Sequence, residues 1–155
     1  MEHHFSGDRP AYTIGIEEEL MILDREGLDL VSAIEELLED APEGEIKPEL
    51  MESVLEISTS PARNTREAGV QLRGLRDQVI ATARARGLAI GSAGTHPFAM
   101  WEDQRIAPHA RYRDLISALR FVARQEIIFG LHVHVAVDDP DKAIHVANGI
   151  RVHVP

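Results

Sequence analysis

The stretch that decides the fold is Tyr12-Thr13-Ile14-Gly15-Ile16-Glu17-Glu18-Glu19-Leu20-Met21-Ile22-Leu23. Its β-branched and apolar residues predict a strand, and the following Asp24-Arg25-Glu26-Gly27 predicts a turn. Side chains alternate along a strand, so Glu17 and Glu19 share one face while Glu18 takes the other and is interpreted as structural. Two carboxylates about 7 Å apart repel each other unless a cation lies between them. Glu17 and Glu19 are therefore candidate metal ligands, and a solvated acidic edge strand is the alternative.

The remaining elements are predicted from hydrophobic period, caps and turn residues. The predicted strands cover 53–60, 88–93 and 130–137. The predicted helices cover 32–40, with capping-box spacing at Ser32, then 64–87, capped by Asn64 or Thr65, and 112–126. A last helix begins at Asp139, and we expect the chain to end within it. Residues 43–52 indicate no clear element.

Alternation of strands and helices alone would indicate a parallel α/β sheet. However, these strands carry polar residues on one side, whereas covered parallel strands are almost continuously apolar. We therefore predict an α+β fold with helices on one face of the sheet.

Composition limits the possible partners. The 155 residues are 44% apolar, enough for one domain with a core, and their formal net charge is −10. An acidic surface argues against nucleic acid or an anionic membrane as the partner. There is no cysteine, and the first residues lack the basic-then-apolar order of a signal peptide. No apolar run approaches the ~20 residues that span a bilayer. We expect a cytoplasmic protein with a disordered N-terminus over residues 1–11 and one domain over residues 12–155.

Further acidic residues follow in the second strand. Glu56 interrupts the apolar pattern between Leu55 and Ile57. It points to water or, if its face is the one shared with Glu17 and Glu19, joins them, because the ligands of one metal converge from several strands.

Three other motifs could carry chemistry. His132-Val133-His134 places two imidazoles on one strand face, which suits metal binding but also occurs as an ordinary histidine pair. Gly94-Thr95-His96-Pro97 is a tight turn after a strand, where ligands often bind, or simply a structural turn. Arg111 could bind a carboxylate or phosphate. No Walker loop and no Gly-x-Gly-x-x-Gly is present, so a nucleotide would need another phosphate site.

Together these motifs resemble the type-2 glutamate–cysteine ligases and related carboxylate–amine ligases. The resemblance runs from about Tyr12 to Pro155. Its matching segments, in the family's order, are Gly15-Ile16-Glu17-Glu18-Glu19-Leu20, Val54-Leu55-Glu56-Ile57-Ser58-Thr59 with Pro61, Gly94-Thr95-His96-Pro97, Arg111-Tyr112 and Gly130-Leu131-His132-Val133-His134-Val135.

The resemblance implies a glutamine-synthetase-like fold, in which an antiparallel sheet forms a funnel lined with metal-binding carboxylates. It implies a reaction in which ATP phosphorylates a carboxylate and an amine attacks the acyl phosphate, with Mg²⁺ or Mn²⁺ bound and small amino acids as substrates. By position, the implied metal ligands are Glu17, Glu19, Glu49, Glu56 and His132. The implied substrate- or nucleotide-side residues are Thr95, His96 and Arg111, with His134 as nearby support.

The resemblance covers only the N-terminal portion of such ligases. We therefore expect an incomplete, truncated funnel that is inactive or weak by itself, with self-association or a missing C-terminal half completing it. Two alternatives stay open: a non-catalytic domain that binds metal or nucleotide as a partner module, and a His-x-His metal hydrolase that uses Zn²⁺.

Overall fold

The computed structural model describes residues 12–39 and 44–154. The disordered segment predicted over 1–11, and Asp40 at the predicted end of the first helix, lie outside these residues. The elements along the chain are β1 (Ile14–Asp24), α1 (Ile34–Leu38), β2 (Ile46–Pro48), β3 (Val54–Ser58), α2 (Thr65–Ala85), β4 (Leu88–Gly91), the 3₁₀ turn η1 (Trp101–Asp103), α3 (Ala110–Leu119), α4 (Phe121–Arg124), β5 (Leu131–Val135), α5 (Pro140–Ile150) and the 3₁₀ turn η2 (Arg151–His153).

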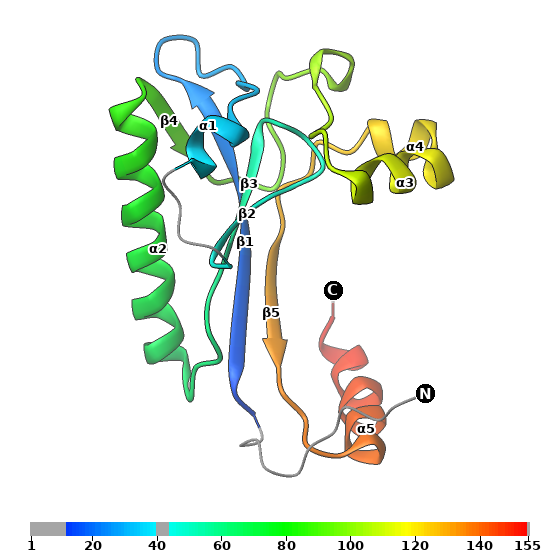
Figure 1. The fold of residues 1–155 in the computed structure, drawn as a ribbon. Helices are drawn as coiled ribbons and strands as arrows, with labels where there is room; N and C mark the ends of the chain where they lie inside the picture. The colour runs from blue at the N-terminus through cyan, green and yellow to red at the C-terminus, as the bar shows by residue number, and fades with distance from the viewer. Residues whose placement is uncertain (1–11, 40–43, 155) are drawn as a thin grey trace.

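The long strand β1 lies at the centre of a five-stranded antiparallel sheet (Figure 1). One edge pairs with β3, which in turn pairs with β2. The other edge is shared, because β5 pairs with residues 14–18 and β4 with residues 21–24. The predicted α+β fold is confirmed, and the sheet is open rather than closed into a barrel.

The first face of the sheet carries the main core. Helices α1 and α2 cover it, and α2 runs beside the sheet along its length in Figure 1. The apolar residues of α2 recur at steps of three and four, which forms one continuous stripe toward the sheet. The buried residues that meet here are Leu20 and Ile22 of β1, Leu55 and Ile57 of β3, and Leu75, Val79 and Ala83 of α2.

The caps of α2 and α5 follow the sequence prediction. Asn64 begins α2 by accepting a hydrogen bond from the Glu67 N–H, and Gly87 lies just beyond its end with φ of +73°. Asp139 caps α5 by accepting from the Lys142 N–H, with Pro140 at the first helical position.

The second face is divided between a small core and a polar surface. Its small core joins Met21, Leu23 and Val54 of the strands to Tyr112 of α3 and Ala123 of α4. Helices α1 and α2 therefore cover the first face beside β1 and β3 but leave Leu131, Val133 and Val135 of β5 exposed. Helices α3 and α4 reach the second face at one end only. The rest of the second face carries the acidic side chains described below.

Three local predictions need correction. The helix predicted over 112–126 is divided into α3 and α4 at Arg120, which has φ of +50°. The predicted Ser32 cap is wrong, since the N-cap of α1 is Ala33 and makes no side-chain hydrogen bond. The last helix ends at Ile150 and continues as η2, so the described chain does not stop within an α-helix.

In the residues described, no helix is both long and apolar enough to cross a bilayer.

Glu18 and Arg76 form an ion pair that ties β1 to α2. The Arg76 Nε and Nη2 donate to the two Glu18 carboxylate oxygens at 2.7 and 2.6 Å, and the Ser92 hydroxyl donates at 3.1 Å. The Glu18 side chain is 4% exposed, whereas Arg76 is 44% exposed. Glu18 is thus a buried carboxylate whose charge is balanced from the surface of α2, which agrees with its interpretation as structural.

We predict that Arg76→Ala lowers the free energy of unfolding by about 3 kcal/mol, the lower end of the range for breaking a buried pair, because Arg76 is partly exposed. Urea unfolding at neutral pH measures this. Arg73→Ala, one turn earlier on the exposed side of α2, is the control and should change stability by less than about 0.5 kcal/mol. Equal effects of the two substitutions would contradict the role of the pair.

Candidate metal and ligand site

A polar row crosses the second face of the sheet. The strand register places Lys47 of β2 opposite Glu56 of β3, and Glu56 opposite Glu19 of β1. Glu17 lies two residues before Glu19 on the same face. The condition set by the sequence is therefore met, because Glu56 shares the face of Glu17 and Glu19.

Three carboxylates converge at this row. One oxygen from each of Glu19, Glu49 and Glu56 lies within 4.8 Å of the others, and all three residues are partly buried. Glu49 comes from the segment that directly follows β2, so three parts of the chain supply the cluster. We call these three residues the carboxylate cluster. Hard oxygen ligands at this spacing are the set that Mg²⁺, Mn²⁺ or Ca²⁺ prefers.

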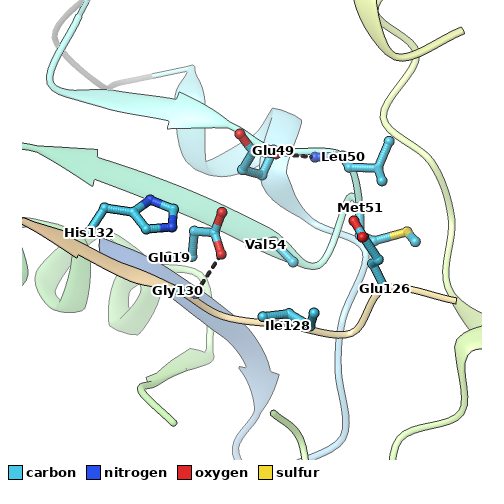
Figure 2. Close-up of a pocket in the computed structure, with 9 residues that line it drawn as sticks. All are labelled: Glu19, Glu49, Leu50, Met51, Val54, Glu126, Ile128, Gly130 and His132. Atoms are coloured by element: carbon cyan, nitrogen blue, oxygen red, sulfur yellow. Dashed lines mark hydrogen bonds between the residues drawn. The ribbon is translucent and has the colours of Figure 1, made fainter. Parts of the chain in front are cut away.

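Backbone groups hold two of these carboxylates in place. The Gly130 N–H donates to Glu19 Oε2 at 2.6 Å, and the Leu50 N–H donates to Glu49 Oε2 at 2.9 Å (Figure 2). A Cβ atom at Gly130 would lie 3.0 Å from His132 Nε2 and 3.3 Å from Glu19 Oε2. Glycine at this position therefore allows the backbone to approach the cluster closely.

The cluster perturbs its own ionisation. Burial raises the pKa of Glu49, and the neighbouring Glu19 and Glu56 carboxylates raise it further, while the Leu50 N–H and Arg111 oppose the rise. Burial, with the Glu49 charge, raises the pKa of the Tyr112 phenol to about 12. The Tyr112 hydroxyl donates to the Pro48 carbonyl at 2.7 Å, which fixes the segment that carries Glu49.

Glu17 faces the histidines instead of the carboxylate cluster. Its Oε2 lies 3.0 Å from His134 Nε2 and 3.7 Å from His132 Nδ1. The two imidazole rings are 6.4 Å apart and nearly perpendicular. His132 also lines the cavity that contains Glu19 and Glu49, and Figure 2 places its ring beside Glu19. His132 therefore lies between the two groups.

Two cavities open beside the cluster. The first, of about 190 Å³, is lined by Glu19, Glu49, Glu126 and His132 together with apolar residues. The second, of about 540 Å³, has walls of both charges. Its acidic residues are Glu17, Glu49 and Glu56, its basic residues are Lys47 and Arg111, and His109, Pro48 and Tyr112 complete the wall. Glu49 lines both, so the cluster lies where the cavities meet.

The other predicted ligand-side residues divide into two groups. Arg111 lines the second cavity, with its Nη2 3.5 Å from Glu49 Oε1. Thr95 and His96 line neither cavity. The Thr95 hydroxyl donates to the Ile127 carbonyl, while His96 is buried with Nε2 on the Leu28 carbonyl and Nδ1 near the Ala99 N–H. These bonds brace a turn, and the ligand role of Thr95 and His96 stays a prediction.

Sequence reasoning missed Lys47, Glu126 and the wall formed by Tyr112. Lys47 lies in β2, whose three residues are too few to show a strand period. The signal that could have found it is its spacing of two residues from Glu49. Glu126 lies just after α4 and lines the first cavity, at a position that the sequence analysis had assigned to the end of a continuous helix.

Comparisons with known proteins match this chain to one family. A model described as glutamate-cysteine ligase family 2 matches residues 13–155. A protein of Rubrobacter xylanophilus named "Putative glutamate--cysteine ligase 2-1" is 44% identical over 158 residues, covering 100% of this chain and 42% of that protein. Similarly named proteins of Solibacter usitatus and Sorangium cellulosum are 42% and 43% identical, covering 97% and 93% of this chain. The chain spans 40% of the length of each of these two.

We predict that Glu49→Gln stabilises the cation-free protein at neutral pH. Because the folded-state pKa of Glu49 lies above its ordinary value of 4.5, the folded chain binds this proton more tightly than the unfolded chain does, and ionising Glu49 destabilises the fold. The contribution of this carboxyl to the free energy of unfolding is therefore fully present below about pH 4.5 and decreases as the pH rises through the raised pKa. Glutamine stays neutral and avoids this loss.

Thermal unfolding in EDTA at pH 7.5 and pH 4 measures the effect. The Tm of Glu49→Gln should exceed that of the wild type at pH 7.5, and the difference should shrink toward pH 4. Glu45→Gln, at an exposed position four residues earlier, is the matched control. A Tm that falls at pH 7.5 would mean that the Glu49 charge supports the fold.

Proposed function

Because this chain belongs to the glutamate–cysteine ligase family 2, we propose that it forms part of an ATP-dependent carboxylate–amine ligase. The observation that carries the proposal is the carboxylate cluster, which gathers Glu19, Glu49 and Glu56 within 4.8 Å at the junction of two cavities. The family indicates the class of reaction. The cluster provides carboxylates that could hold a cation, and such a cation could neutralise the negative charge of the reacting phosphoryl group.

The donor set fits Mg²⁺ or Mn²⁺. All three clustered ligands are carboxylates, which are hard oxygen donors, and each retains partial access to solvent for bound water. Glu19, Glu49 and Glu56 would hold the cation, with Glu17 and His132 as further candidate ligands at the adjoining edge. When bound, such a cation neutralises charge on transferring phosphoryl oxygens.

The proposed reaction has two steps. A carboxylate oxygen of the first substrate attacks the γ-phosphorus of ATP, the bond to the β–γ bridging oxygen breaks, and ADP leaves. The amine of the second substrate then attacks the acyl carbon, phosphate leaves, and the nitrogen loses a proton to give the amide. Both steps need orientation and charge stabilisation and no nucleophile from the protein.

The second cavity suits an amino acid as substrate. An α-amino acid carries an ammonium and a carboxylate, and the cavity wall offers acidic groups for one and Lys47 and Arg111 for the other. Glutamate and cysteine are the substrates that the relatives' names indicate, and we propose this pair first. Because the chain spans about two fifths of those relatives, we propose that these residues supply one wall of the ligase site.

We predict that Mg²⁺ or Mn²⁺ stabilises the fold. At one hundred times its dissociation constant, a cation that binds only the folded state adds about 2.7 kcal/mol. For a domain of this size, this raises Tm by roughly 5–10 °C. Glu56→Gln should remove the shift, whereas Glu36→Gln, at an exposed position on α1, should keep it. Zinc retained through dialysis would instead favour the His-x-His hydrolase alternative.

We predict ATP-dependent amide formation by the full product of the gene. ADP release with Mg²⁺, ATP, glutamate and cysteine, coupled to mass spectrometry of the product, measures it. Glu56→Gln should lower kcat on the order of 100-fold, as expected when an electrostatic stabiliser is lost, and Glu36→Gln should not. The 155-residue chain assayed alone should turn over little or not at all. ATP consumption without an amide product for any amino acid in a panel would overturn the ligase assignment.

A further inference from the structure

We propose that Lys47 is a positioning residue of the carboxylate cluster, which acts with Ser58 to hold the Glu56 carboxylate in the orientation that a divalent cation needs. The inference rests on the proposed function for the presence of a cation. It adds a role for two residues that lie outside the cluster and do not themselves contact the cation.

Lys47, Ser58 and Glu56 form a closed triangle of hydrogen bonds. The Lys47 ammonium donates to Glu56 Oε1 at 3.2 Å and to the Ser58 hydroxyl at 2.9 Å. The Ser58 hydroxyl donates in turn to the same Oε1 at 2.8 Å. Both partners therefore bind the same carboxylate oxygen, which restricts rotation of the carboxylate and leaves Oε2 outside the triangle.

The pairing of β2 with β3 places these three residues next to one another on one face of the sheet. Lys47 is the direct cross-strand partner of Glu56, and Ser58 follows Glu56 by two residues on the same face of β3. The segment after Lys47 is fixed in turn, because Tyr112 binds the Pro48 carbonyl. The triangle is thus built on the paired strands β2 and β3, a more rigid support than a loop.

Burial separates this contact from an ordinary surface ion pair. The Glu56 side chain is only 13% exposed, while the Lys47 side chain is 43% exposed. A carboxylate at that depth is poorly solvated, so a fixed cationic partner matters more to it than to a surface glutamate. The ammonium remains reachable from the second cavity, which Lys47 also lines.

Charge balance supports a lysine that stays in place when the cation binds. When ionised, the three clustered carboxylates carry more negative charge than one divalent cation neutralises, and Lys47 beside Glu56 and Arg111 beside Glu49 supply further positive charge. Groups that hydrogen-bond to metal ligands orient them, and losing such a group weakens metal affinity about 10- to 100-fold. Simple Coulomb repulsion between ammonium and cation predicts the opposite sign, because removing Lys47 would then tighten cation binding. The sign of the change therefore decides between the two accounts.

The test measures Mn²⁺ affinity by electron paramagnetic resonance of free Mn²⁺, without ATP or substrates. Lys47→Met should weaken Mn²⁺ binding about 10- to 100-fold, and Lys47→Arg, which keeps the donors and charge, should restore most of the loss. Ser58→Ala should weaken binding on its own but add little in the Lys47→Met background, because both act through Oε1. Lys142→Met removes the same charge from a surface pair with Asp138 and should leave the affinity unchanged.

Each outcome bears on the inference. Equal or tighter Mn²⁺ binding by Lys47→Met, with thermal unfolding still cooperative, overturns the positioning role and leaves the proposed ligase untouched. Loss of binding that Lys47→Arg does not restore also overturns it, since the ammonium contacts would then not be the cause. If neither wild type nor Lys47→Met binds Mn²⁺, the cation site itself is wrong and the inference is overturned with it.

Discussion

The two-residue period of β1 constrains everything else in this structure. It turns Glu18 toward α2, where Arg76 and Ser92 bind it, and turns Glu17 and Glu19 toward the opposite face. A shift of one residue in the pairing would bury Glu17 and Glu19 against apolar helices and expose Leu20 and Ile22. The buried ion pair of Glu18 therefore does more than join two elements, because it also fixes which carboxylates reach the second face.

The second face of the sheet gathers negative charge that the fold alone would not favour. Three partly buried carboxylates lie within 4.8 Å, and the raised pKa of Glu49 reflects their burial and mutual repulsion. Lys47, Arg111 and backbone N–H groups relieve only part of this repulsion. Repulsion of this kind is typical of functional sites, where local stability is often lower, and it is the reason that the cluster carries the proposed cation site.

The sheet is also asymmetric in its covering. The first face has a continuous core under α1 and α2, whereas β5 and α5 present exposed apolar side chains, among them Leu131, Val133, Ile144 and Ile150. Residues 131–135 pair only with β1 among the strands described. The polar site thus lies between a well-packed layer and the exposed edge formed by β5. The relatives reported above are more than twice as long as this chain.

The sequence by itself determined the elements with a clear period and their faces. Strand alternation separated Glu18 from Glu17 and Glu19, the steps of three and four located α2, and Asn64 and Asp139 marked two helix starts. Local patterns suffice there because the deciding interactions lie within a few residues of one another. The resemblance grouped Glu49 with Glu19 and Glu56, and the structure brings these three together. Only the tertiary structure decided that Glu17 turns to His134, that Lys47 binds Glu56, and that His96 braces a turn. Those outcomes depend on the register between strands far apart in the chain, and no local period records that register.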